Sequence, residues 1–307
     1  MADAREDGGA GGTGGGWKDF VAGSVAGAAQ VVVGHPLDTI KVRMQIEGPG
    51  VFRGPVDCLL KTVRNEGLLG MYKGMASPLV GIAAVNSLLF WAYSLGKTLQ
   101  TGSPAATPTL GQVAIAGAGA GVVNSVLASP VELLKVRLQA QYGSPGSAPA
   151  FRGPVALARH LVRQFGARGI AWGFWATVAR EIPAYAAFYT GFEFAKRRFA
   201  QALAGGDADR LGPLPLMASG SVGGVSYWVA SYPLDVVKSR VQNSAAPPRG
   251  LGYIAAAARE IAAEQGWRGF FRGFSPSVLR SIPAAAVTFA TYELVMRALN
   301  SGQRQLQ

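Results

Sequence analysis

One motif occurs three times in this chain of 307 residues and constrains its fold more than any other feature. The motif reads Pro-x-acid-x-x-Lys-x-Arg-x-Gln, and its copies span residues 36–45, 130–139 and 233–242. Each copy ends a Gly/Ala-rich apolar run, and successive copies begin 94 and 103 residues apart. Solenoid repeats are much shorter than this, so we expect each unit to be a small module of several helices.

The composition favours a membrane protein. Hydrophobic residues make up 49% of the chain and charged residues only 15%, while Gly occurs 42 times, a frequency better tolerated in membrane helices. The net charge of +12 indicates a partner that is nucleic acid, anionic lipid or an anionic solute. Because the charges stand singly between apolar runs and form no stripe, we expect no nucleic-acid binding.

Cysteine and histidine give no sign of a metal site or cofactor. The single Cys58 excludes an intramolecular disulfide and a multi-Cys zinc site, and we expect it to pack in the interior. His35 and His160 have no partners at metal-ligand spacing. No phosphate loop or catalytic triad pattern appears either, so an enzyme is the least favoured interpretation.

Six apolar stretches are long enough to cross a bilayer. Each carries polar residues on one side, which suits a helix bundle around a water-filled cavity, although a soluble helical protein remains an alternative. The predicted fold class is therefore an all-α membrane protein with six transmembrane helices in three pseudo-threefold repeats. The stretches span approximately residues 18–44, 75–99, 110–139, 174–202, 213–242 and 274–299.

Two further patterns recur in each unit. An amphipathic run of about a dozen residues, such as Pro55–Glu66, follows each odd-numbered stretch and predicts a short helix on the membrane surface. Small residues one turn apart open the odd-numbered stretches and predict close packing of helix backbones. These small-residue pairs are Gly23 and Gly27, Gly117 and Gly121, and Gly220 and Gly224.

Three in-phase copies of the motif resemble the mitochondrial carrier family of solute transporters, over about residues 17–300. The resemblance implies a threefold pseudosymmetric barrel in the mitochondrial inner membrane that works as a monomer, by alternating access and without a cofactor. We expect residues 1–16 to be a disordered tail, followed by repeats at 17–103, 104–206 and 207–302.

The same resemblance implies cardiolipin at the segment that precedes each even-numbered helix, which begins a helix and so suits an anion. In the first repeat this segment runs from Glu66 to Gly74. The second repeat departs from the pattern, because Phe165 and Trp172 stand where an acid and a base are expected. A lipid site there is in doubt.

The repeated motif also predicts a gate. Proline kinks a helix, so three kinked helices can converge, and each carries an acid and a base one turn apart. We interpret these charges as a gate facing the matrix, against the alternative of surface ion pairs worth about 0–1 kcal/mol each. By family analogy the pairs are Asp38–Lys135, Glu132–Lys238 and Asp235–Lys41, with Gln45, Gln139 and Gln242 as braces.

A second gate at the opposite, cytoplasmic end is predicted to close less firmly. The family's aromatic-acid-x-x-base motif is intact only in the second repeat, where Glu193 and Lys196 supply the charges. The first repeat retains only the base, Lys97, and the third retains only the acid, Glu293, so we expect these two residues to pair.

Internal alignment locates the candidate substrate site. Seven residues after the Gly that opens each even-numbered helix lie Gly81, Arg180 and Arg280, and the next residues include Ile82 and Glu181. They fall about two turns into the helices, about 10 Å from the helix start. Ionisable groups at that depth are functional by default, although an internal Arg–Glu pair that only holds helices together is an alternative.

Two arginines and one carboxylate suit a substrate that carries both a carboxylate and an ammonium group, with Glu181 near the ammonium. The amino-acid sequence of these segments resembles the carnitine/acylcarnitine and basic-amino-acid branch of the family. Gly81 and Ile82 are expected to form a roomy apolar wall for an acyl chain, with Asn86 as a further contact, whereas Tyr227 and Trp228 are expected to pack.

Transport is expected to be antiport. A carrier of acidic or neutral amino acids or oxo-acids remains an alternative, as does a membrane scaffold that does not transport.

Overall fold

The computed structural model describes residues 16–47, 50–103, 106–141, 151, 153–248, 250 and 252–304. The predicted tail lies outside this part of the chain, except for Gly16, which is helical. The described part is a bundle of helices without strands, and the predicted all-α fold class is confirmed. Its long helices coincide with the six predicted stretches: α1 (Gly16–Ile46), α3 (Ala76–Thr101), α4 (Leu110–Gln139), α7 (Phe174–Leu203), α8 (Pro213–Gln242) and α10 (Phe274–Arg304).

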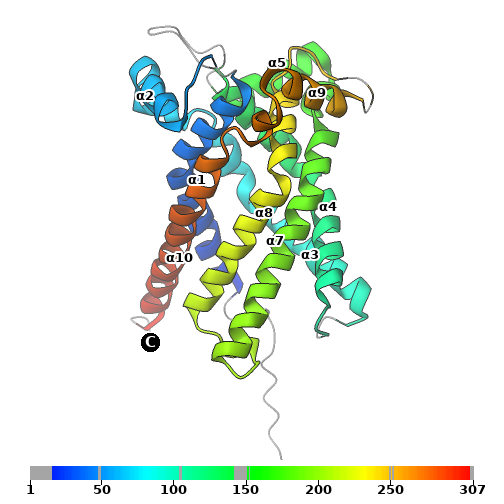
Figure 1. Ribbon diagram of the computed structural model, residues 1–307. Helices are drawn as coiled ribbons and strands as arrows, with labels where there is room; N and C mark the ends of the chain where they lie inside the picture. Colours follow the sequence, from blue (N-terminus) through cyan, green and yellow to red (C-terminus); the bar gives the residue numbers. More distant parts are fainter. Residues whose placement is uncertain are drawn as a thin grey trace, which may run out of the picture.

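Three short amphipathic helices gather at one end of the bundle (Figure 1). They are α2 (Pro55–Glu66), α5 (Pro154–Phe165) and α9 (Tyr253–Gln265), and the first begins and ends where the sequence predicts. The C-terminal end of α10 and the connection from α7 to α8 lie at the opposite end (Figure 1). Short turns complete the chain: η1 (Leu68–Tyr72), α6 (Ala167–Ile170), η2 (Ala208–Arg210) and η3 (Trp267–Phe271).

Three helical segments of the described chain are long and apolar enough to cross a membrane by length and composition, namely Leu68–Thr101, Leu110–Gln139 and Trp267–Met296. Of the other long helices, α1 and α7 carry more charged side chains than α3 and α4, which lowers their hydropathy, whereas α8 is rich in Gly and Ser. Large apolar side chains such as Val80, Leu99 and Ile115 are exposed on the outside of the bundle. Such a surface suits contact with lipid rather than water.

Glycines with positive φ shape the joints that the sequence repeats. Gly67, at φ 73°, ends α2, and Gly74, at φ 81°, precedes α3. Only glycine adopts these angles without strain. A side chain at Gly74 would also lie 2.9 Å from the backbone oxygen of Lys135, so glycine lets α3 start directly against α4.

Small residues allow close helix contact in the second repeat. An added Cβ at Gly117 or Gly121 would lie 2.6 Å from the backbone oxygen of Tyr185 or Glu181, so the backbones of α4 and α7 nearly touch. In the first repeat, Gly27 faces Ile82 at 3.2 Å. The prediction is wrong for Gly23, Gly220 and Gly224, which have open space beside them. In α8 it is Gly223 that meets α7.

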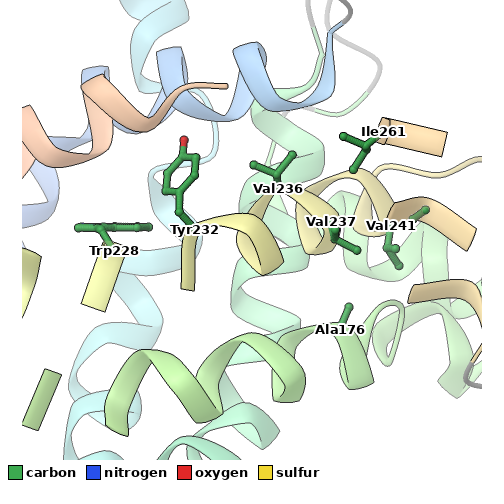
Figure 2. Packing of buried hydrophobic residues seen from close by; sticks show 8 residues of the cluster. Ala176, Trp228, Tyr232, Val236, Val237, Val241 and Ile261 are labelled. Atoms are coloured by element: carbon green, nitrogen blue, oxygen red, sulfur yellow. The ribbon is translucent and has the colours of Figure 1, made fainter. Parts of the chain in front are cut away.

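The largest apolar cluster joins a surface helix to the bundle. Val236, Val237 and Val241 of α8 pack with Ile261 of α9 and Ala176 of α7 (Figure 2). β-Branched side chains after the proline thus fix α9 against the end of α8. Cys58 packs in the corresponding cluster of the first repeat and is fully buried, as predicted.

Candidate substrate-binding cavity and ion-pair ring

The three predicted ion pairs form between α1, α4 and α8. Lys135 Nζ lies 2.5 Å from Asp38 Oδ2, and Lys238 Nζ lies 2.5 Å from Glu132 Oε2. Lys41 Nζ lies 2.7 Å from Asp235 Oδ2. Each pair joins two different repeats, so the six residues form a closed ring, called the ion-pair ring below.

Four of the six ring residues are buried, and Glu132 and Lys135 are half-buried. Side-chain exposure is at most 27%, at Glu132, and falls to 1% at Asp235. Buried pairs of this kind cost desolvation energy, and losing one partner is strongly destabilising. The alternative of exposed surface ion pairs is therefore wrong for this chain.

Only one of the predicted glutamine braces contacts the ring. Gln45 Nε2 donates to Asp235 Oδ2 at 2.9 Å. The prediction is wrong for the other two, because nearer partners take their amide groups. Gln139 donates to Thr39 Oγ1 at 3.1 Å, and Gln242 donates to Thr177 Oγ1 at 3.4 Å.

Both predicted arginines contact the ring. Arg180 Nη2 donates to Glu132 Oε1 at 2.7 Å, and its Nε lies 3.4 Å from Asp235 Oδ1. Arg280 Nε lies 3.1 Å from Asp38 Oδ1. All three ring acids therefore have an arginine partner in addition to their lysine.

A cavity of about 450 Å³ lies on the side of the ring that faces away from α2, α5 and α9, with the ring at its floor. Four cations and two carboxylates line it, so its floor is electropositive: Lys41, Lys135, Arg180 and Arg280, with Asp38 and Glu132. Asn86 lines it as predicted. Tyr227 and Trp228 also line it, and both pack against the apolar cluster of α8 and α9 as expected. Depth along α8 was the available signal, since both residues stand one to two turns before the motif.

Gly81 and Ile82 do not line this cavity, and the predicted apolar wall is wrong in this structure. An added Cβ at Gly81 would lie 2.8 Å from Val131 Cγ2, so the space is filled by α4. Ile82 faces Gly27 of α1 in a separate groove of about 190 Å³. Because residue 81 has no side chain, the valine that follows Pro130 packs directly on α3.

Glu181 is also absent from the cavity lining. It is 1% exposed and forms an ion pair with Arg180. Its backbone lies against Gly121 of α4, which closes the helix crossing around it. In this structure the Glu181 carboxylate therefore cannot make the predicted contact with a substrate ammonium. Its partner is Arg180, which it holds in place.

Comparisons with known proteins agree with this geometry. The sequence pattern of the family described as "Mitochondrial carrier protein" matches three times, at residues 13–103, 106–203 and 209–303. The chain belongs to the mitochondrial carrier family. It is accordingly a transporter and not an enzyme, as predicted.

Several relatives match the carrier over nearly its whole length. A "Mitochondrial carnitine/acylcarnitine carrier-like protein" of Arabidopsis thaliana is 41% identical, covering 92% of this chain and 98% of that protein. A "Mitochondrial substrate carrier family protein S" of Dictyostelium discoideum is 40% identical, covering 92% and 98%. A "Mitochondrial basic amino acids transporter" of Bos taurus is 36% identical and covers 94% of each chain.

At the end of the carrier near α2, α5 and α9, each repeat is tied to the next by one equivalent donor. Lys73 Nζ donates to the backbone oxygen of Gln141 at 3.0 Å. Trp172 Nε1 donates to that of Val241 at 3.0 Å, and Arg272 Nε donates to that of Met44 at 2.8 Å. The indole N–H of Trp172 thus replaces the missing base of the second repeat.

An ion cluster supports this joint in the first repeat. Glu66 accepts hydrogen bonds from Arg43, at 2.9 Å, and forms an ion pair with Lys73. Burial alone would raise the pKa of Glu66, but the hydrogen bonds from Arg43 and Lys73 outweigh it and hold the pKa below its usual range. In the second repeat Phe165 replaces the acid and stacks edge-on against Trp172.

The predicted cytoplasmic gate residues are not brought together among the described side chains. Glu193 pairs with Arg197 on its own helix at 2.7 Å, rather than with a base of another repeat. Lys97 Nζ lies 5.4 Å from the centre of the Tyr93 ring. The side chain of Glu293 lies outside the described part of the chain, so the pair of Lys97 and Glu293 remains a prediction.

Proposed function

We propose that this carrier exchanges a small solute bearing both a carboxylate and an ammonium group, such as carnitine, acylcarnitine or an amino acid, by alternating access. The observation that carries the proposal is the electropositive cavity floor made by Arg180 and Arg280. Arginine offers two parallel N–H donors to a carboxylate. Relatives named for carnitine/acylcarnitine and for basic amino acids support this class of solute.

The contacts of the two arginines suggest how binding is coupled to opening. Arg180 holds Glu132 and Asp235, and Arg280 holds Asp38. A substrate carboxylate that takes over these guanidinium groups removes one partner from each ring acid. The remaining lysine pairs then cost less to break, and this lowers the barrier to opening the ring. Glu181 keeps Arg180 aimed at the floor.

The proposal places the carrier in the mitochondrial inner membrane, as a multi-pass monomer without nucleic-acid partners. The ion-pair ring is the gate on the matrix side. Cardiolipin is the proposed lipid partner, at a pocket of about 290 Å³ beside the start of α3. Lys73 lines this pocket, and the positive end of the helix favours a phosphate there.

Uptake into liposomes tests the proposal. The full-length carrier is reconstituted, and liposomes are preloaded with carnitine, acylcarnitine, lysine, arginine, ornithine, glutamate, glycine or ADP. We expect exchange of a carboxylate-plus-ammonium solute, lost in Arg180→Ala. The Glu181→Gln variant should retain the same substrate order at a lower rate, because Glu181 acts through Arg180.

Two results would overturn the proposal. Exchange of oxo-acids or other anions alone would indicate an anion carrier, which the two arginines also permit. Failure of the folded protein to exchange any of these solutes would indicate a scaffold that retains the carrier fold.

A further inference from the structure

The carboxylates that line the cavity are already paired. Asp38 contacts Lys135 and Arg280, and Glu132 contacts Lys238 and Arg180. A primary ammonium group brings three N–H donors that each require an acceptor. To use Asp38 or Glu132, such a group would have to compete with two protein cations at once. The floor therefore suits the anionic end of a substrate and disfavours a primary ammonium.

The wall above the floor is aromatic. Its rings form a connected series, in which Tyr185 lies 5.5 Å from Tyr227 and 6.2 Å from Tyr189, measured between ring centres. Tyr189 stacks on Tyr93 at 3.6 Å, which fixes its orientation. The aromatic residues that line the cavity are Phe90, Tyr185, Phe188, Tyr189, Tyr227 and Trp228.

Protein cations already lie against the lower rings of this wall. Arg180 Cζ lies 5.5 Å from the centre of Tyr227, and Lys41 Nζ lies 4.2 Å from the centre of a Trp228 ring. Arg280 Cζ lies 5.8 Å from the same residue. The rings of Tyr227 and Trp228 thus already contact protein cations. Tyr185 and Phe188 continue the same surface away from the floor.

We infer that the substrate's cationic end is a fully alkylated ammonium group bound by this aromatic wall, with Tyr185 as a specificity-determining residue. A quaternary ammonium has no N–H groups to satisfy and binds aromatic faces directly. Tyr185 and Tyr189 follow Arg180 by five and nine residues, or about 8 and 14 Å along α7. A short chain can therefore join a carboxylate at the floor to a cation at the wall. This inference rests on the proposed function.

A pair of solutes that differ only in three methyl groups tests it. Uptake of labelled γ-butyrobetaine and of labelled γ-aminobutyrate is measured with the full-length carrier, each against the same compound inside the liposomes. We expect the uptake efficiency to favour γ-butyrobetaine about tenfold, a ratio within the range of cation–π interactions. Tyr185→Leu should reduce the preference about fivefold, whereas Tyr185→Phe, which keeps the ring, should retain it.

The wild-type comparison decides even if a variant fails to fold. Equal uptake of the two compounds, or preference for γ-aminobutyrate, would overturn the inference and leave the proposed function standing. Uptake of neither compound by a carrier that exchanges only anions would overturn both. A preference that Tyr185→Leu leaves unchanged would remove Tyr185 from the role assigned to it.

Discussion

The crossing of α4 and α7 offers a sharp test of how packing supports the site. In Gly121→Ala, the new Cβ would lie 2.6 Å from the backbone oxygen of Glu181, whereas ordinary contacts begin near 3.4 Å. Because the neighbour is backbone, the helices must separate by about 0.8 Å. Overpacking of this kind costs about 1–3 kcal/mol. Alanine returns about 0.5–1 kcal/mol through its helix propensity.

The matched control is Gly119→Ala. Gly119 lies two residues before Gly121, on the opposite side of α4, and an added Cβ there has nothing within 4 Å. We expect Gly121→Ala to lower the melting temperature in detergent by about 2–8 °C and Gly119→Ala to leave it equal or higher. The exchange rate should fall only in Gly121→Ala, because the shift moves Glu181 and, through it, Arg180. Equal melting temperatures and equal rates for the two variants would refute the close-contact argument.

Three further predictions concern other parts of the carrier. Because the pKa of Glu66 is held below its ordinary value of 4.5, its ion cluster should stabilise the fold above pH 4.5 and lose that effect as the pH falls through the lower folded pKa. The stability difference between wild type and Glu66→Gln, measured by thermal unfolding from pH 7 to pH 3, should therefore shrink at low pH. Burial raises the pKa of Cys58 to about 11, so iodoacetamide at pH 7.5 should label Cys58 only after unfolding, and rapid labelling of the folded carrier would contradict its position. Asp38→Lys should destabilise the carrier by about 3–5 kcal/mol, and adding Lys135→Asp should restore part of the loss, because Arg280 still lies beside residue 38. If the double variant is no more stable than the single one, the two residues do not pair.

Much of the fold could be predicted because the determinants are local and repeated. The motif places an acid and a base one turn apart after each proline, so three copies in register bring Asp38 to Lys135 and Glu132 to Lys238. The glycine landmarks act through their own backbone angles, as at Gly67 and Gly74. The pairs themselves join distant repeats, but both partners belong to the same repeated motif, so the family analogy could name them.

The details of the site depended on contacts that spacing does not encode. Gly81 has the right depth to line the cavity, but Val131 of another repeat occupies its space. Glu181 has the right depth too, but its backbone lies against Gly121 and its carboxylate forms an ion pair with Arg180. Gln139 donates its hydrogen bond to Thr39 and not to a residue of the ring. Symmetry between repeats predicts positions, whereas side-chain volume in the neighbouring repeat decides access.

The proposed function depends on the arginines of the cavity floor, which we infer bind the substrate carboxylate in the two-donor geometry of guanidinium. The most direct measurement is the exchange rate of the preferred substrate by Arg280→Lys in proteoliposomes, with Arg259→Lys on the exposed face of α9 as the matched control. Lysine keeps the charge but loses the planar pair of donors. We expect a loss of about tenfold or more for Arg280→Lys, with the control unchanged. Wild-type exchange by Arg280→Lys would contradict it.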